Sequence, residues 1–136
     1  MSAKHTPKLQ AAVFDVDGML LDTREFIFQA YEDTLLRFGH AVPSRQDISK
    51  QIGRSLETCY LAFAPDGNIA ALCLAHDAFQ NKPEMIGLIT AYPGVPGMLR
   101  ELQAAGLKLA VFSSRKLTLV SSLEQAGIAD FFEVIV

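Results

Sequence analysis

Two aspartates, Asp15 and Asp17, lie two positions apart at the end of an apolar run, residues 9–16, and Gly18 follows them. In an extended segment, residues two apart point to the same side, so both carboxylates can flank one small volume. The two carboxylates repel each other unless a cation lies between them, and Mg²⁺ prefers hard oxygen ligands of this kind. One carboxylate can then attack a phosphoryl group while the other protonates the leaving oxygen and activates water. The pattern predicts phosphoryl transfer with Mg²⁺ held by Asp15 and Asp17, although an isolated Asp-x-Asp-Gly is also typical of a simple turn.

A second polar group, Ser113, Ser114 and Arg115, follows the apolar run of residues 107–112. Ligands of parallel sheets collect at the carboxyl ends of the strands. A serine hydroxyl and the amides at the start of a following helix form a cradle for phosphate. We therefore expect Ser113, Ser114 and Gly18 to bind phosphate and Arg115 to bind substrate. Ser114 has a structural alternative, capping the next helix.

Short apolar runs indicate the elements that must position these residues. Residues 9–16, 107–112 and 131–136 are predicted to be buried strands. Helices are expected over residues 97–105 and 116–126, each followed by a glycine. Parallel neighbours need crossover connections, so this alternation predicts an α/β fold with a doubly wound parallel sheet.

Residues 22–90 carry no convincing strand pattern and are predicted to be an all-helical insertion. Residues 1–21 and 91–136 would then form the α/β core, and residues 22–90 a helical domain. Four helix starts are expected in the insertion: Asp22, which can form a capping box with Glu25, then Ser44, Ser55 and Ile69.

Composition excludes several classes of function. The chain has 12 Lys and Arg against 15 Asp and Glu, a formal charge of −3, and 50% hydrophobic residues. This balance argues against a nucleic-acid binder, which would need clustered basic residues. The longest apolar stretch, residues 69–75, is far shorter than the roughly 20 residues of a membrane-spanning helix. With no export signal we expect a cytoplasmic protein, whose Cys59 and Cys73 are reduced core thiols. Nothing in the sequence indicates the oligomeric state.

Two segments resemble motifs of the haloacid dehalogenase superfamily. Residues 12–23, AVFDVDGMLLDT, resemble the first motif of that family. Residues 92–114, from YPGV to GLKLAVFSS, resemble the segment that leads into its second motif. The insertion lies where the subgroup similar to phosphoglycolate phosphatase and β-phosphoglucomutase carries a helical cap. The resemblance implies that Asp15 is the nucleophile and a Mg²⁺ ligand. It implies that Asp17 is the general acid and base, with its backbone carbonyl on the metal, and that Ser113 binds the transferring phosphoryl group.

The sequence departs from the family pattern at several points. Met19 occupies a position that is commonly threonine, and Ile27 stands where the sugar-phosphate mutases carry a cap histidine. The lysine of the third motif and the acidic residues of the fourth would both follow Val136. We therefore expect the sequence to be an N-terminal part of a longer enzyme that alone binds Mg²⁺ poorly and turns over slowly, if at all.

The function favoured by these patterns is a Mg²⁺-dependent phosphatase that acts on a small phosphorylated metabolite, with no nucleic-acid or membrane partner. A β-phosphoglucomutase-like phosphotransferase and an inactive binding module remain alternatives. A phospho-receiver domain fits less well, because it carries its phospho-accepting Asp on a later strand after short crossovers, whereas some 90 residues of helix separate the first two predicted strands here. Arg54, at a turn that faces the active site in relatives, is predicted to bind a substrate carboxylate or second phosphate, or to be a solvated turn residue. Asp22 is expected to be a helix cap rather than a ligand.

Overall fold

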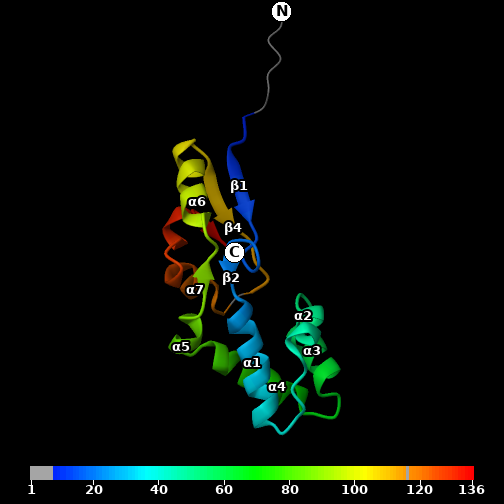
Figure 1. Ribbon diagram of the computed structural model, residues 1–136. Helices are drawn as coiled ribbons and strands as arrows, with labels where there is room; N and C mark the ends of the chain where they lie inside the picture. Colours follow the sequence, from blue (N-terminus) through cyan, green and yellow to red (C-terminus); the bar gives the residue numbers. More distant parts are fainter. Residues whose placement is uncertain (1–7, 116) are drawn as a thin grey trace, which may run out of the picture. The chain divides into compact units, whose positions relative to one another are not determined.

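The computed structural model describes residues 8–115 and 117–136, and this part of the chain divides into two compact units (Figure 1). One unit is formed by the chain up to Asp22 together with Thr90–Val136, and the other by Thr23–Ile89. The break points lie within one residue of those expected for an insertion over residues 22–90. None of the described helices is long and apolar enough to cross a membrane.

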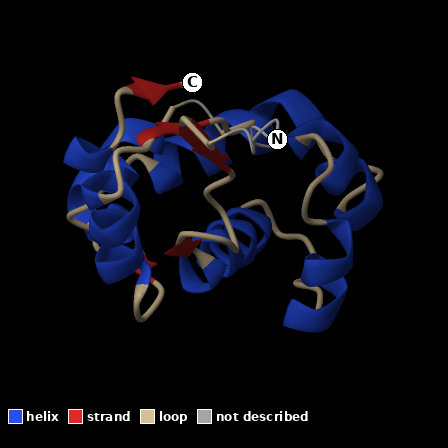
Figure 2. Cartoon of the chain, turned by 90° about the horizontal axis from the view of Figure 1, so that it is seen from above, coloured by secondary structure: helices blue, strands red, loops and turns tan. Residues whose placement is uncertain are grey.

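The first unit is built on three parallel strands, which pair in the order β1-β4-β5. Val13 aligns with Ala110, and Ala110 with Val134, so the three strands run in register. This arrangement confirms the predicted α/β fold with a parallel sheet. The strands are shorter than the predicted runs (Figure 2), and comprise β1 (Ala11–Phe14), β4 (Lys108–Val111) and β5 (Val134–Ile135).

Crossover helices connect these strands, as parallel pairing requires. The helix α6 (Val95–Ala104) precedes β4 and packs on it. Between β4 and β5 lie α7 (Leu119–Gln125) and the 3-10 turn η1 (Ala129–Phe131). The predicted start of α7 falls on Lys116, which lies outside the described residues, and the final strand is shorter than expected because η1 occupies its first position.

The two faces of the sheet differ in burial. Leu109 and Val111 of β4 are fully buried. Val13 and Val134, which flank Ala110 in register, are 67% and 50% exposed. The strand β1 lies at one edge of the three-stranded sheet. The described unit therefore buries one face of the sheet and exposes apolar side chains on the other.

Two short strands that were not predicted lie where the chain passes between the units. The strand β2 (Leu21–Asp22) pairs antiparallel with β3 (Thr90–Ala91). The cap position of the first helix falls on Thr23, one residue after the predicted Asp22, and Asp22 lies in the extended ladder opposite Thr90. The helix begins two residues later, with Thr23 as its cap residue and no side-chain capping hydrogen bond.

The second unit is helical. Two of its predicted caps are confirmed: the Ser44 hydroxyl accepts the N–H of Asp47, and that of Ser55 accepts the N–H of Thr58. A fifth, short helix that was not predicted begins at Pro83, a residue that suits the first turn of a helix. The helices of this unit are α1 (Arg24–Arg37), α2 (Arg45–Gln51), α3 (Leu56–Phe63), α4 (Ile69–Gln80) and α5 (Pro83–Ile86).

Replacing Ser55 with alanine is expected to destabilise this helical unit by about 1 kcal/mol, because α3 loses the acceptor for the Thr58 N–H. The measurement is the free energy of unfolding in urea. Ser49→Ala is the matched control, since the Ser49 hydroxyl bonds the Arg45 carbonyl inside α2 and caps nothing. A Ser55→Ala protein as stable as the Ser49→Ala protein would contradict the capping role.

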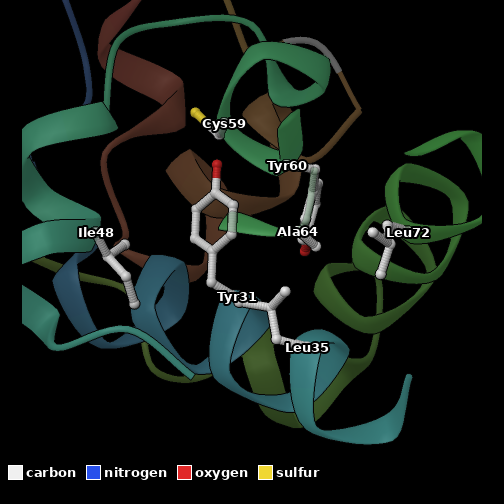
Figure 3. Packing of buried hydrophobic residues seen from close by; sticks show 7 residues of the cluster. All are labelled: Tyr31, Leu35, Ile48, Cys59, Tyr60, Ala64 and Leu72. Carbon is white, nitrogen blue, oxygen red and sulfur yellow. The ribbon is translucent and has the colours of Figure 1, made fainter. Parts of the chain in front are cut away.

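An aromatic cluster forms the core of the helical unit. Figure 3 shows Tyr31 of α1 and Tyr60 of α3 side by side, with their ring centroids 5.3 Å apart. His76 of α4 completes the cluster: it is 4% exposed, and its Nδ1 lies 2.8 Å from the Tyr60 hydroxyl. Burial lowers the pKa of His76 to about 4, so the ring is neutral near neutral pH. Cys59 and Cys73 are free thiols, as expected.

Candidate active site

The ends of β1 and β4 bring the first predicted site residues to one edge of the sheet. The Phe112 N–H donates to the Phe14 carbonyl at 2.9 Å, so the two strands stay paired to their last residues. Asp15 directly follows this pairing on one strand, and Ser113 follows it on the other. Asp15 is exposed to solvent, and its Oδ1 accepts the neighbouring Val16 N–H at 2.8 Å. The nucleophile candidate is therefore accessible and not turned into the core.

The loop after β1 is held by hydrogen bonds to the backbone of one buried residue, Val16. The carbonyl of Val16, whose side chain is fully buried, accepts three successive backbone N–H groups at 3.0 to 3.2 Å, those of Met19, Leu20 and Leu21. Gly18 has φ of +75°, a conformation that side-chain-bearing residues rarely adopt, and it allows this tight reversal. The backbone on both sides of the two aspartates is thus fixed by hydrogen bonds.

Ser113 is oriented by its own loop. Its side chain is buried, its N–H donates to the Val136 carbonyl at 2.8 Å, and its Oγ accepts the Arg115 N–H at 3.1 Å. That hydroxyl hydrogen has no acceptor among the described residues, so it is available to a ligand. Ser114 is exposed and does not cap α7, whose cap residue is Thr118. The structural alternative for Ser114 is therefore wrong.

Asp17 and Arg115 form an ion pair across 98 positions of sequence. Arg115 Nη2 lies 2.8 Å from Asp17 Oδ1, and Arg115 Nε lies 3.2 Å from Asp17 Oδ2. The guanidinium also donates from Nη1 to the hydroxyls of Thr118 and Ser122. Arg115 was expected at the site, but its pairing with Asp17 and its contacts with Thr118 and Ser122 were not predicted from the sequence. Their spacing of three and seven positions from Arg115, typical of one helix face, was the available signal.

The oxygen atoms at this edge of the sheet suit a metal ion that takes only some of its ligands from the protein. Asp15 Oδ2 and the backbone carbonyl of Asp17 accept no hydrogen bond within the described ranges 8–115 and 117–136. Mg²⁺ usually takes one or two carboxylates and keeps several waters, so two free oxygens fit such a site. The same ranges contain no group of three or more His, Cys, Asp or Glu side chains that could hold a metal. The described residues thus fit an open Mg²⁺ site and not an all-protein cage.

A cavity of about 600 Å³ opens at the end of β4 in the first unit. Ser113, Ser114 and Arg115 form part of its lining, and Phe112, Ile135 and Val136 give it apolar walls. Arg54 belongs to the helical unit, where it is exposed in the turn between α2 and α3. Its predicted contact with substrate stays a prediction.

Sequence relatives resemble the chain over most of its length. The pyrophosphatase PpaX of Bacillus pumilus is 32% identical over 134 residues, which cover 94% of this chain and 59% of that protein. PpaX of Listeria monocytogenes is 31% identical over 133 residues, covering 96% and 60%. The chain therefore spans about 60% of the length of these relatives.

Solved structures share the fold. A haloacid dehalogenase-like family hydrolase from Streptococcus pneumoniae superposes with a TM-score of 0.82 at 22% identity, covering 93% of this chain and 60% of that one. A predicted phosphatase from Clostridium acetobutylicum superposes with a TM-score of 0.78 at 26% identity, covering 95% and 61%. The haloacid dehalogenase-like hydrolase family itself matches residues 12–136, which include both strand ends and the segment between them. The chain belongs to the haloacid dehalogenase-like hydrolase family.

Proposed function

We propose that the first unit carries the phosphoryl-transfer site of a Mg²⁺-dependent phosphatase, which hydrolyses a small phosphorylated compound through an aspartyl-phosphate on Asp15. The observation that carries this proposal is the ion pair between Asp17 and Arg115, because it joins the loops that follow β1 and β4. Membership of the hydrolase family supports the reaction class.

Each residue of the site has a defined part in this proposal. Asp15, accessible and next to a fixed backbone turn, attacks phosphorus with its free Oδ2. Asp17 gives a proton to the leaving oxygen and later takes one from water. Ser113 donates its hydroxyl hydrogen to a phosphoryl oxygen. Ser114 offers its backbone amide to the phosphoryl group at the same edge of the sheet. Gly18 contributes through the turn that it allows, since its own N–H donates to the Leu21 carbonyl at 3.1 Å.

The Asp15 carboxylate and the Asp17 carbonyl would hold Mg²⁺. When bound, the ion would neutralise charge on the carboxylate and on the transferring phosphoryl group. The protein's own contribution is to present these two oxygens from one hydrogen-bonded loop.

The helical unit Thr23–Ile89 serves in this proposal as the cap domain, which closes over the substrate and excludes water. Arg54 would then bind a second phosphate or a carboxylate of the substrate, since a guanidinium matches both groups with two hydrogen bonds. The relatives named pyrophosphatase make inorganic pyrophosphate the first compound to test.

The experiment measures phosphate release by the purified chain from pyrophosphate and from a set of sugar and short-chain phosphate monoesters, with enzyme in excess. We expect release that requires added Mg²⁺ and stops when the metal is chelated. A Ser113→Ala variant should slow release by roughly 10- to 1,000-fold, because one donor to the phosphoryl oxygens is lost. Release that persists at full rate without Mg²⁺, or release that Ser113→Ala leaves unchanged, would overturn the proposal.

A further inference from the structure

The loops that follow β1 and β4 are joined at two levels. Backbone pairing ends where the Phe112 N–H donates to the Phe14 carbonyl at 2.9 Å. Past that point the Arg115 side chain reaches Asp17: its Nη2 lies 2.8 Å from Asp17 Oδ1, and its Nε lies 3.2 Å from Asp17 Oδ2. The strands therefore fix where the two loops begin, and Arg115 joins them again through its side chain.

Arg115 also contacts Ser113, the other candidate at this edge of the sheet. The Arg115 N–H donates to Ser113 Oγ at 3.1 Å, and Ser113 is 7% exposed. Because this N–H occupies a lone pair of the hydroxyl oxygen, the hydroxyl hydrogen must point away from it. One residue thus bonds Ser113 through its backbone and Asp17 through its guanidinium. These are two of the groups that the proposed function places around one phosphoryl group.

Buried hydroxyls at the start of α7 hold the guanidinium. Its Nη1 donates to Thr118 Oγ1 at 3.0 Å and to Ser122 Oγ at 2.8 Å. Thr118 is 3% exposed and Ser122 is fully buried, and Ser122 Oγ also donates to the Thr118 carbonyl. The Arg115 side chain itself is 15% exposed. An arginine with four directed hydrogen bonds and little exposure keeps one rotamer, so it fixes the orientation of the carboxylate that it contacts.

The placement of Asp17 matters because this residue acts in both steps of the proposed reaction. In the first step an Asp15 oxygen bonds phosphorus, the bond to the leaving oxygen breaks, and Asp17 gives that oxygen a proton. In the second step water displaces Asp15 from phosphorus and gives a proton to Asp17. A displacement of about 1 Å in a reacting group costs on the order of 10²-fold in rate.

We propose that Arg115 is a positioning residue for phosphoryl transfer, which sets the placement of the Asp17 carboxylate relative to Ser113. Thr118 and Ser122 hold Arg115 in this role. The inference rests on the proposed function and goes beyond it, because it assigns a part in the reaction to three residues that need not touch the substrate. It also differs from the expectation that Arg115 binds substrate.

The first test asks whether Arg115 connects α7 to the loop after β1, and it needs no activity. It follows the backbone amide signals of Asp17 and Gly18 by NMR in the isotopically labelled 136-residue chain without metal. We expect Ser122→Ala to move both signals, although Ser122 is bonded to the guanidinium and not to that loop. In an Arg115→Gln background the same substitution should leave the two signals unchanged, because the connecting guanidinium is gone.

Ser121→Ala is the matched control for this experiment. Ser121 occupies the neighbouring position of α7, and its hydroxyl donates to the Thr118 carbonyl at 3.2 Å. Its replacement should leave the amide signals of Asp17 and Gly18 in place in either background. If Ser122→Ala moves these signals equally with and without Arg115, or does not move them, the proposed connection is overturned.

The second test measures the effect on the reaction, with the chain in excess over p-nitrophenyl phosphate and with Mg²⁺ present. In Arg115→Gln, phosphate release at saturation should slow by roughly 10- to 100-fold, while the saturation constant changes by less than about threefold. Arg115→Lys keeps the charge but not the two parallel hydrogen bonds, so it should restore part of the rate. Thr118→Val and Ser122→Ala should slow release by less than Arg115→Gln.

Arg100→Gln replaces an exposed arginine of α6 and should release phosphate at the wild-type rate. Thermal unfolding of every variant verifies that it is folded. A rate in folded Arg115→Gln equal to that of Arg100→Gln would overturn the proposal. A saturation constant that rises while the rate at saturation is unchanged would also overturn it, since Arg115 would then be a substrate-binding residue.

Failure of the proposed function gives a different result. The amide signals would then respond to Ser122→Ala as expected, but Ser113→Ala and Asp15→Asn would release phosphate at the wild-type rate. That outcome would place the reaction elsewhere and overturn the catalytic role of Arg115, while the connection between the two loops would stand.

Discussion

Replacing Asp15 with asparagine is expected to lower phosphoryl transfer by at least about 10³-fold, because an amide oxygen is a poor nucleophile for phosphorus. The fold should persist, since the Asp15 side chain is exposed and its described hydrogen bond is to the adjacent Val16 N–H. The measurement is the single-turnover rate of nitrophenolate release, with thermal unfolding as the structural check.

Asp130→Asn is the matched control for this substitution. Asp130 is an exposed aspartate of η1 in the same unit, so its replacement removes one negative charge without touching the strand ends. It should retain the wild-type rate. A folded Asp15→Asn protein with the same rate as Asp130→Asn would place the nucleophile elsewhere.

Acid is expected to destabilise the helical unit through His76. Burial holds the pKa of His76 at about 4 in the folded chain, against an ordinary value of 6.5. Above pH 6.5 the ring is neutral in both states and contributes nothing to the pH dependence. As the pH falls toward 4, the unfolded chain takes up a proton that the folded chain refuses, so the free energy of unfolding falls by about 3 kcal/mol in total.

The ionisable neighbours of His76 add one opposing contribution to the pH dependence of the free energy of unfolding. Tyr31 and Tyr60 have pKa values raised by burial, so both are neutral throughout the acid range. Asp77 has its pKa raised, first by desolvation and then by Glu57, so its contribution has the opposite sign and grows as the pH falls. Urea unfolding between pH 7 and 4 measures the balance.

His76→Gln is the informative variant, because its amide can still bond the Tyr60 hydroxyl but does not titrate. The loss of stability in acid should largely disappear in this variant. It should remain in His40→Gln, which removes a histidine from the turn after α1. An unchanged pH dependence in His76→Gln would show that another group causes the acid destabilisation.

Local signals in the sequence were sufficient for most elements of the fold. Ser44 and Ser55 mark helix starts by their own hydrogen bonds, and the glycine at position 39, with φ of +75°, follows α1. Such features are determined by neighbouring residues, so they can be predicted from the local sequence. The strands β2 and β3 were missed because two residues each give no period, and their pairing joins positions nearly 70 residues apart.

The candidate site was predictable to the level of which strand ends carry it. Asp15, Asp17 and Ser113 were selected from residue type and position after an apolar run. The pairing of Asp17 with Arg115 was not, because it depends on the register between β1 and β4 and on the direction in which α7 presents its hydroxyls. Interactions of this range are set by tertiary packing rather than by local sequence.

The most direct test of the site is to locate the phosphoryl group on the protein. Chain quenched in acid during turnover of p-nitrophenyl phosphate is digested, and the peptides are analysed by mass spectrometry. We expect one phosphoryl group on the peptide that contains Asp15, labile to hydroxylamine as an acyl phosphate is, and absent from Asp15→Asn. A phosphoryl group on another residue, or substrate turnover with no phosphorylated peptide in the wild-type protein, would contradict the account.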